Sequence, residues 1–102
     1  MAKLLEYVDK REGTPDVMFM CPGCKCGHSV YVAGRKNIMN GATWTFNNDF
    51  EKPTFTPSIL VRWQNKKHDF TCHSYVKDGM IQFLDDCTHE LKGQTVELPN
   101  IE

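Results

Sequence analysis

The stretch Cys21-Pro-Gly-Cys24-Lys-Cys26-Gly-His28 is expected to decide the fold of this chain. A second cluster lies far along the sequence, where Cys72-His73 is followed later by Cys87-Thr88-His89. The two clusters hold every cysteine and histidine except His68. Soft ligands in two distant groups suit a tetrahedral zinc site, because each group supplies part of the shell and the metal ties the segments together. The pattern therefore predicts a zinc-binding domain.

Cys21 and Cys24 form the stronger half of the predicted shell. The proline between them fixes the entry to the turn and the glycine permits a tight return, so both thiolates can point at one ion. His73 and Cys87 are the predicted second half, because the expected hairpin places both at one end and on reachable sides. The predicted metal ligands are therefore Cys21, Cys24, His73 and Cys87.

Other members of the two clusters remain alternatives. Cys26 could replace Cys24 if the turn is placed two residues later. His28 and His89 could complete the shell, hydrogen-bond a thiolate from outside it, or flank an open coordination position. Cys72 is expected to be a small buried apolar side chain, since it and the next residue point to opposite faces of a strand.

The rest of the pattern predicts strands and turns. Residues 70–76 and 80–84 predict a hairpin around Asp78-Gly79, a pair suited to a two-residue type I′ turn. This register places Val76 opposite Ile81 and Ser74 opposite Phe83. No segment shows a helical period over about ten residues or more. We therefore predict a mostly β fold, a small zinc-ribbon-like antiparallel β domain with hairpins and long loops, in which residues 1–102 form a single metal-stabilised domain.

Charge and composition exclude several classes of protein. The formal net charge of −1 argues against a surface that binds nucleic acid through bulk positive charge. A local basic patch is still compatible with the sequence, because Lys66 and Lys67 lie close to Trp63. No apolar run approaches the roughly 20 residues of a membrane span. The Cys-x-x-Cys spacing and the odd count of 5 cysteines favour a metal over a disulfide framework, and hence a reducing compartment.

Several longer segments carry a resemblance. They are the Cys-Pro-Gly-Cys turn with His28-Ser-Val, the run from Lys52 to Val61, and the run from Cys72 to His89. Over residues 19–99 the chain resembles a family of small zinc-binding proteins encoded by phages and prophages, of unknown function and often mislabelled "ammonia monooxygenase". The matching ligand candidates are Cys21, Cys24, His28, His73, Cys87 and His89, whereas Cys26 departs from the usual pattern.

The resemblance implies a phage-encoded accessory protein with a metal site. We expect structural zinc and a protein–protein interaction surface, with a second phage protein or a host protein as partner, in the host cytoplasm or the virion. No catalytic residue is predicted, and an enzyme is not the leading expectation. One alternative is a zinc-dependent hydrolase or nuclease with an open coordination position, in which Glu90, Asp85 or Asp86 acts as the base. A second alternative is a nucleic-acid-binding zinc ribbon.

Overall fold

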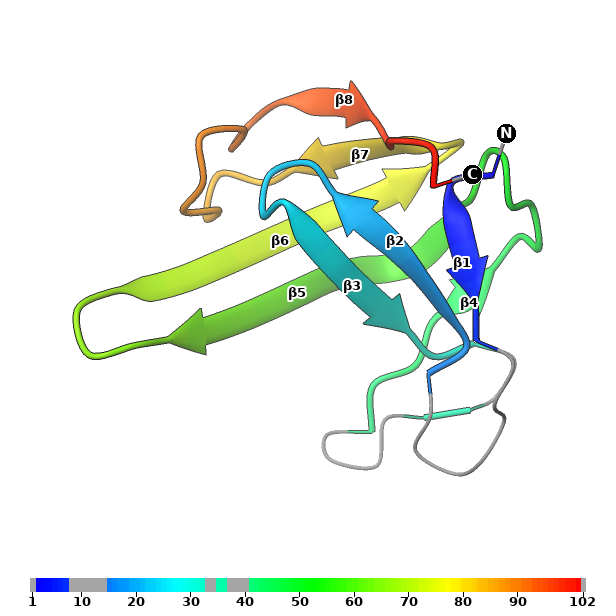
Figure 1. Cartoon of the computed structure of the whole chain (residues 1–102), viewed down its shortest axis with the longest axis horizontal. Coiled ribbons are helices and arrows are strands. Elements are labelled where there is room, and N and C mark those ends of the chain that lie inside the picture. The colour runs from blue at the N-terminus through cyan, green and yellow to red at the C-terminus, as the bar shows by residue number, and fades with distance from the viewer. Residues whose placement is uncertain (1, 8–14, 33–34, 37–40, 102) are drawn as a thin grey trace.

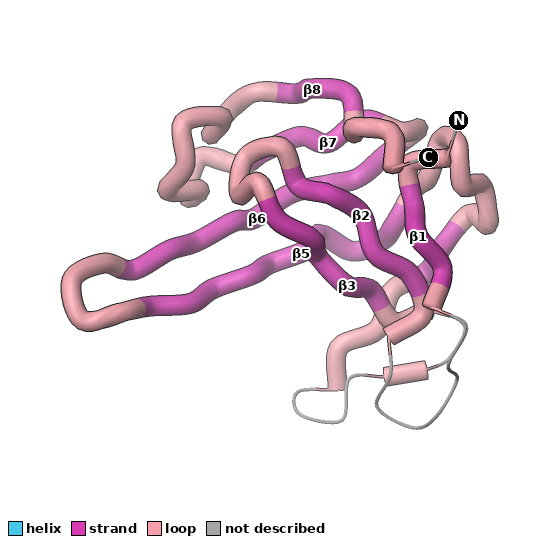
Figure 2. The backbone as a smooth tube through the Cα atoms, viewed as in Figure 1, coloured by secondary structure: helices cyan, strands magenta, loops and turns pink. Residues whose placement is uncertain are grey.

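A computed structural model of the chain describes residues 2–7, 15–32, 35–36 and 41–101. Within these ranges the chain forms two antiparallel sheets and no helix, which confirms the predicted β fold (Figures 1 and 2). The first sheet has the order β1-β2-β3 and the second the order β4-β5-β6-β7-β8. The strands are β1 (Leu4–Glu6), β2 (Val17–Cys21), β3 (Cys26–Val30), β4 (Thr45–Phe46), β5 (Phe55–Gln64), β6 (Asp69–Lys77), β7 (Met80–Phe83) and β8 (Thr95–Glu97).

The cysteine turn joins β2 to β3. Cys21 and Cys26 are the last paired residues of these strands, so the turn closes over residues 22–25. Lys25 adopts a left-handed φ of 60° and donates its backbone N–H to the Cys21 carbonyl at 2.8 Å. The first cluster of the sequence is therefore a tight hairpin end at the edge of the three-stranded sheet.

The hairpin of β6 and β7 has the predicted register. Val76 pairs with Ile81 and Ser74 with Phe83. Asp78 and Gly79 have positive φ angles of 53° and 79°, as a type I′ turn requires.

Strand β5 contains a bulge. Between Phe55, which pairs with Val76, and Ile59, which pairs with Ser74, β5 advances four residues while β6 advances two. A bulge of this kind bends its strand and re-aims the side chains within it. Ser58 lies in this bulge, and its carbonyl accepts a hydrogen bond from Trp44 Nε1 at 3.2 Å.

The core lies between the two sheets, since β2 and β3 cross one face of the five-stranded sheet (Figure 1). Phe19 of β2 meets Phe55 of β5 across this layer, with ring centroids 6.4 Å apart. Residues of β6 alternate, so Cys72 and Ser74 are buried on this inner face. His73 and Tyr75 point to the opposite side, which we call the outer face.

Among the described residues, no segment forms a helix long and apolar enough to cross a membrane.

Candidate active site and metal cluster

Three side chains on the outer face form a hydrogen-bonded chain. Ser58 Oγ lies 2.9 Å from His73 Nε2, and His73 Nδ1 lies 3.0 Å from Asp86 Oδ2. The two ring nitrogens of one imidazole therefore bridge a hydroxyl and a carboxylate. This is the arrangement of a Ser-His-Asp catalytic triad, which is recognised by its geometry and not by its sequence order.

The carboxylate determines where the protons lie. An ionised Asp86 can only accept, so His73 Nδ1 carries the ring proton and donates it to Oδ2. A neutral ring then has a free lone pair on Nε2, which accepts the Ser58 Oγ–H. The serine hydroxyl is consequently hydrogen-bonded to a base that can take its proton.

The bulge in β5 brings Ser58 to His73. The pairing partner of His73 on β5 is Leu60, two residues beyond Ser58. Because residues 56–58 bulge out of the ladder, the Ser58 side chain turns back toward the imidazole. Trp44, which immediately precedes β4, donates its indole N–H to the Ser58 carbonyl, and this hydrogen bond restrains the backbone at Ser58.

The loop between β7 and β8 supplies Asp86 and is hydrogen-bonded to β6. The Cys87 thiol lies 3.2 Å from both the backbone N–H and the carbonyl of His73. Thr88 donates its N–H to the Thr71 carbonyl at 2.9 Å and accepts the Thr71 N–H on Oγ1 at 3.0 Å. These bonds fix the segment that follows Asp86 against the strand that carries His73.

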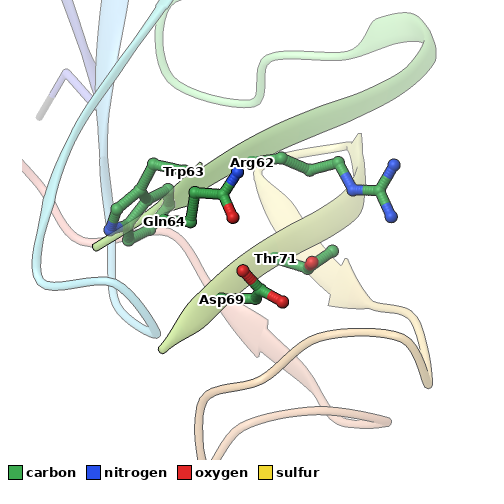
Figure 3. A pocket seen from close by; sticks show the side chains of 5 residues that line it. All are labelled: Arg62, Trp63, Gln64, Asp69 and Thr71. Carbon is green, nitrogen blue, oxygen red and sulfur yellow. The ribbon is translucent and has the colours of Figure 1, made fainter. Parts of the chain in front are cut away.

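The triad is accessible from solvent. The side chains of His73 and Asp86 are 25 % and 55 % exposed. Two hollows lie along the hairpin on either side of the Ser58–His73 pair. One, of about 360 Å³, is lined by Arg62, Trp63, Gln64, Asp69 and Thr71 (Figure 3). The other, of about 460 Å³, has Thr56, Tyr75, Met80, Gln82 and Thr95 in its wall.

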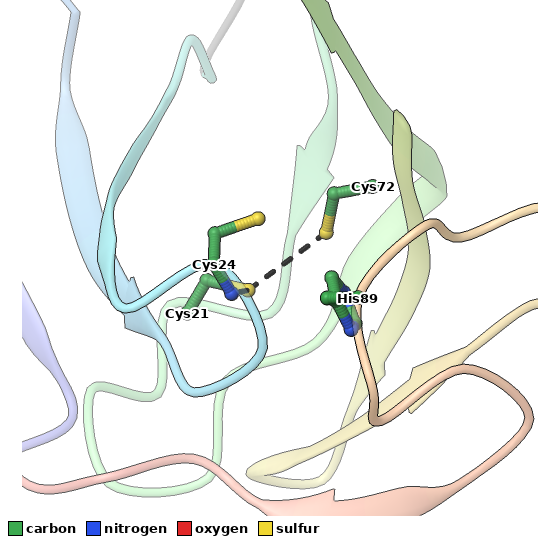
Figure 4. A group of neighbouring side chains, drawn as sticks. All are labelled: Cys21, Cys24, Cys72 and His89. Carbon is green, nitrogen blue, oxygen red and sulfur yellow. Dashed lines mark hydrogen bonds between the residues drawn. The ribbon is translucent and has the colours of Figure 1, made fainter. Parts of the chain in front are cut away.

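A separate cluster of metal-ligand side chains lies on the inner face. Potential ligand atoms of Cys21, Cys24, Cys72 and His89 all lie within 4.8 Å of one another (Figure 4). The Cys21 and Cys72 sulfurs are 3.8 Å apart. Neighbouring sulfurs of a tetrahedral zinc shell are separated by about 3.8 Å, given a bond of about 2.3 Å. The cluster therefore has the donor set and the spacing of a possible Cys3His metal site.

The three sulfurs of the cluster differ in protonation. The hydrogen bond from the Cys72 thiol lowers the pKa of Cys21 to about 4. Burial raises the pKa of Cys24 to about 12, and the hydrogen bond to Cys21 raises the pKa of Cys72 as well. Without a metal the group holds one thiolate and two thiols, since three sulfur anions this close would repel one another.

His89 fits the cluster because residue 23 is glycine. A Cβ at Gly23 would collide with Cε1 and Nε2 of the His89 ring. The ring packs edge-on against Phe83, with centroids 4.5 Å apart, and Leu91 N–H lies 3.3 Å from Nδ1. His89 Nε2 and His28 Nε2 are both buried without a hydrogen-bond partner among the described residues, and of the two rings it is His89 that groups with the three cysteines. A buried nitrogen without a protein partner is open to a ligand from outside the chain.

The structure places some of the predicted ligands together and others apart. Cys21, Cys24 and the secondary candidate His89 belong to the cluster, whereas His73 and Cys87 lie outside it. The reason is strand alternation: Cys72, expected as an apolar core side chain, points inward with its thiol in the cluster, and His73 points outward. Which four residues bind a metal stays a prediction, and the geometry favours Cys72 and His89 as its second half.

The other two candidates lie close to the cluster but are not part of it. His28 is buried with its ring edge-on to Phe19 at 5.5 Å, and it lowers the pKa of Cys21 by hydrogen bonding. Cys26 is exposed at the start of β3. None of the five cysteines is in a disulfide.

The sequence pattern indicates Asp86 only as a base beside zinc and does not distinguish Ser58. The serine stands in Pro57-Ser58-Ile59, which lacks the glycines of the G-x-S-x-G nucleophile turn. The signal that could have found it is the proline pair around residue 55, which predicts an irregular crossing where a side chain can be re-aimed.

Comparison with known proteins supplies the family. No curated protein and no solved structure matches the chain. Residues 2–84 match the family described as "Bacterial ubiquitination-like system serine protease (BubE)". The matched part includes Ser58 and His73, and Asp86 follows two residues after its end.

This match overturns the functional expectation from sequence. A phage-encoded accessory protein that acts only by protein–protein interaction is wrong, because the family belongs to a bacterial system and is described as a serine protease. The zinc-hydrolase and nucleic-acid-ribbon alternatives fail for the same reason. Since the match spans most of its length, the chain belongs to the family of bacterial ubiquitination-like system serine proteases, BubE.

Proposed function

We propose that this chain is a serine peptidase in which Ser58 is the nucleophile, His73 the general base and Asp86 the residue that orients His73. The observation that carries the proposal is the pair of hydrogen bonds through one imidazole, 2.9 Å to Ser58 Oγ and 3.0 Å to Asp86 Oδ2. The family description supports the same chemistry independently of the geometry.

The reaction follows from the positions of the protons. Ser58 Oγ attacks the scissile carbonyl carbon while its proton passes to His73 Nε2. Asp86 stabilises the imidazolium that forms, through the Nδ1–H bond. His73 then gives the proton to the leaving nitrogen, and the C–N bond breaks to leave an acyl-Ser58 ester. Water, deprotonated by His73, hydrolyses that ester and restores the Ser58 hydroxyl.

The family description suggests the class of substrate. We propose that the bond cleaved is a peptide or isopeptide bond in a protein component or conjugate of a ubiquitination-like system. The open position of the triad suits a protein substrate, because a chain can approach the outer face without entering an enclosed cavity.

We further propose that Cys21, Cys24, Cys72 and His89 bind zinc and that this zinc is structural. Four protein ligands rich in cysteine make a closed shell. Bound there, zinc would cross-link the β2–β3 turn, β6 and the loop after β7. That loop also carries Asp86, so the cross-link supports the triad from the inner face. A thiolate site of this kind suits a reducing compartment such as the cytoplasm of the bacterium.

Covalent labelling tests the assignment of the nucleophile. A fluorophosphonate probe should attach to the wild-type protein at Ser58, which peptide mass spectrometry can locate. Ser58→Ala and His73→Ala should abolish labelling. Ser29→Ala is the matched control, because Ser29 is an exposed strand serine that is hydrogen-bonded to Tyr7 and far from His73 in the fold. Labelling that persists in Ser58→Ala would refute the proposal.

A further inference from the structure

We infer that the hollow beside Tyr75 is a substrate subsite that binds an apolar side chain close to the scissile bond. This inference rests on the proposed peptidase function and adds the specificity of that site. It has two supports: the position of the hollow relative to the triad and the chemistry of its wall.

The position follows from strand geometry. Tyr75 is the next residue after His73 on the outer face of β6, and Thr71 is the next one before it. Same-face neighbours of a strand are about 7 Å apart, which is also the length of two residues of an extended peptide. Thr56, in the wall of the same hollow, comes two residues before Ser58. A peptide lying along β6 with its reacting carbonyl at Ser58 therefore places a nearby side chain over this hollow.

The wall combines apolar groups with a polar rim. Tyr75 and Met80 in this wall are 47 % and 39 % exposed. Leu60, paired with His73 and 48 % exposed, continues this apolar surface past the imidazole. Around it stand polar residues that can hydrogen-bond a peptide backbone: Thr56, Gln82 and Thr95. Exposed apolar groups bordered by polar ones mark a binding site, because burying them on a ligand is favourable.

The second hollow combines an aromatic side chain with polar ones. It lies toward the far end of the β5–β6 hairpin, and its wall holds Trp63 together with Arg62, Gln64, Asp69 and Thr71 (Figure 3). Trp63 is 43 % exposed, so this hollow also offers an apolar surface. The hollow beside Tyr75 has more apolar side chains in its wall, Tyr75 and Met80 among them, and is the better fit for an apolar residue of a substrate.

Cleavage-site profiling tests this subsite directly. The full chain is incubated with a peptide library made from a denatured proteome, and mass spectrometry identifies the cut sites. One position near the cut should be enriched in aliphatic or aromatic residues. The double variant Tyr75→Ala/Met80→Ala should lose this enrichment and lower kcat/KM for a cleaved apolar peptide by about tenfold or more. Tyr75→Arg should shift the same position toward acidic residues.

Two controls separate the subsite from the catalytic proposal. Leu5→Ala removes an exposed leucine of the other sheet and should leave the profile unchanged. Fluorophosphonate labelling of Ser58 should proceed in the Tyr75 and Met80 variants at the wild-type rate within about twofold, which also shows that they fold. A profile without an apolar preference, or one that the variants do not alter, overturns the subsite while Ser58 labelling stands. Absence of both Ser58 labelling and cleavage overturns the peptidase proposal and the subsite with it.

Discussion

Cys72 and His73 are consecutive in β6, yet their side chains belong to different sites on opposite faces of the sheet. The Cys72 thiol lies 3.8 Å from Cys21 Sγ on the inner face, and His73 bridges Ser58 and Asp86 on the outer face. The alternation of a strand produces this separation without any special backbone. One strand therefore carries both a metal ligand candidate and the candidate catalytic base, on opposite faces of the sheet.

Replacement of the carboxylate should lower the rate more than the affinity. Asp86→Asn keeps the size of the side chain, but its amide can donate to His73 Nδ1 and thereby favour the wrong tautomer. We expect kcat to fall by about 10²–10⁴-fold. The decrease should lie near the lower end of this range, because Asp86 is half-exposed and water can partly take over its hydrogen bond to His73. Steady-state kinetics on a cleaved peptide measure the effect.

The neighbouring acidic residue provides the control for this experiment. Asp85→Asn changes the same charge one residue earlier, at another exposed position. It should leave kcat within about twofold of wild type. If both variants were equally impaired, a general loss of negative charge near the site would explain the result, and Asp86 would have no individual role.

Metal content should separate the two adjacent residues of β6. Cys72→Ala removes one member of the inner cluster and should reduce bound zinc well below one ion per chain. His73→Ala should keep full zinc and lose catalysis, because the imidazole points to the outer face. Elemental analysis of the purified variants gives the answer. Full loss of zinc in His73→Ala, with retention in Cys72→Ala, would restore the ligand set predicted from sequence.

Much of the sheet could be predicted from local pattern, and the sites could be predicted only in part. The Asp78-Gly79 turn determined the register of β6 and β7, because that dipeptide fits one turn type and alternation does the rest. The Cys-Pro-Gly-Cys turn predicted Cys21 and Cys24 as one half of a cluster, which the structure shows. Both signals are local, because each is contained in a few consecutive residues.

The features that the sequence does not predict depend on contacts between distant segments. Whether Cys72 or His73 faces the first cluster depends on how the three-stranded sheet packs, which no local pattern encodes. Ser58 reaches His73 only because two extra residues bulge out of β5, and Asp86 reaches it through a loop. Without a linear motif, the only sequence signal near this Ser, His and Asp is the proline pair around residue 55, which indicates an irregular strand and no catalytic role.

Zinc binding should release two protons per ion near neutral pH. The pKa of Cys21 is lowered to about 4, so that thiol is already ionised, whereas the raised pKa values of Cys24 and Cys72 keep both as thiols. Zinc must displace those two protons, so its affinity should rise by about a hundredfold for each unit of pH between about 5 and 8. Calorimetric titration in buffers of different ionisation enthalpy counts the protons.

The same count distinguishes this cluster from other ligand sets. Release of three protons would mean that Cys21 is an ordinary thiol in the metal-free protein. Release of none would mean that imidazole or carboxylate ligands, and not these sulfurs, hold the ion.

Gly23 should be essential to the inner cluster for steric reasons. Gly23→Ala introduces a Cβ that collides with Cε1 and Nε2 of His89, so either the ring or the β2–β3 turn must move. We expect weaker zinc binding and a loss of about 1–3 kcal/mol in the free energy of unfolding, the usual cost of overpacking a tight contact. Zinc competition with a chromophoric chelator and denaturant unfolding measure the two effects.

Gly27→Ala is the matched control for this substitution. Its Cβ would meet Met18 Sδ at 2.6 Å, but a methionine thioether is the flexible end of a side chain and can move aside. This variant should bind zinc as tightly as the wild type. Normal zinc binding by Gly23→Ala would contradict the assignment of His89 as a ligand. The fourth ligand would then be another donor, such as the nearby buried His28.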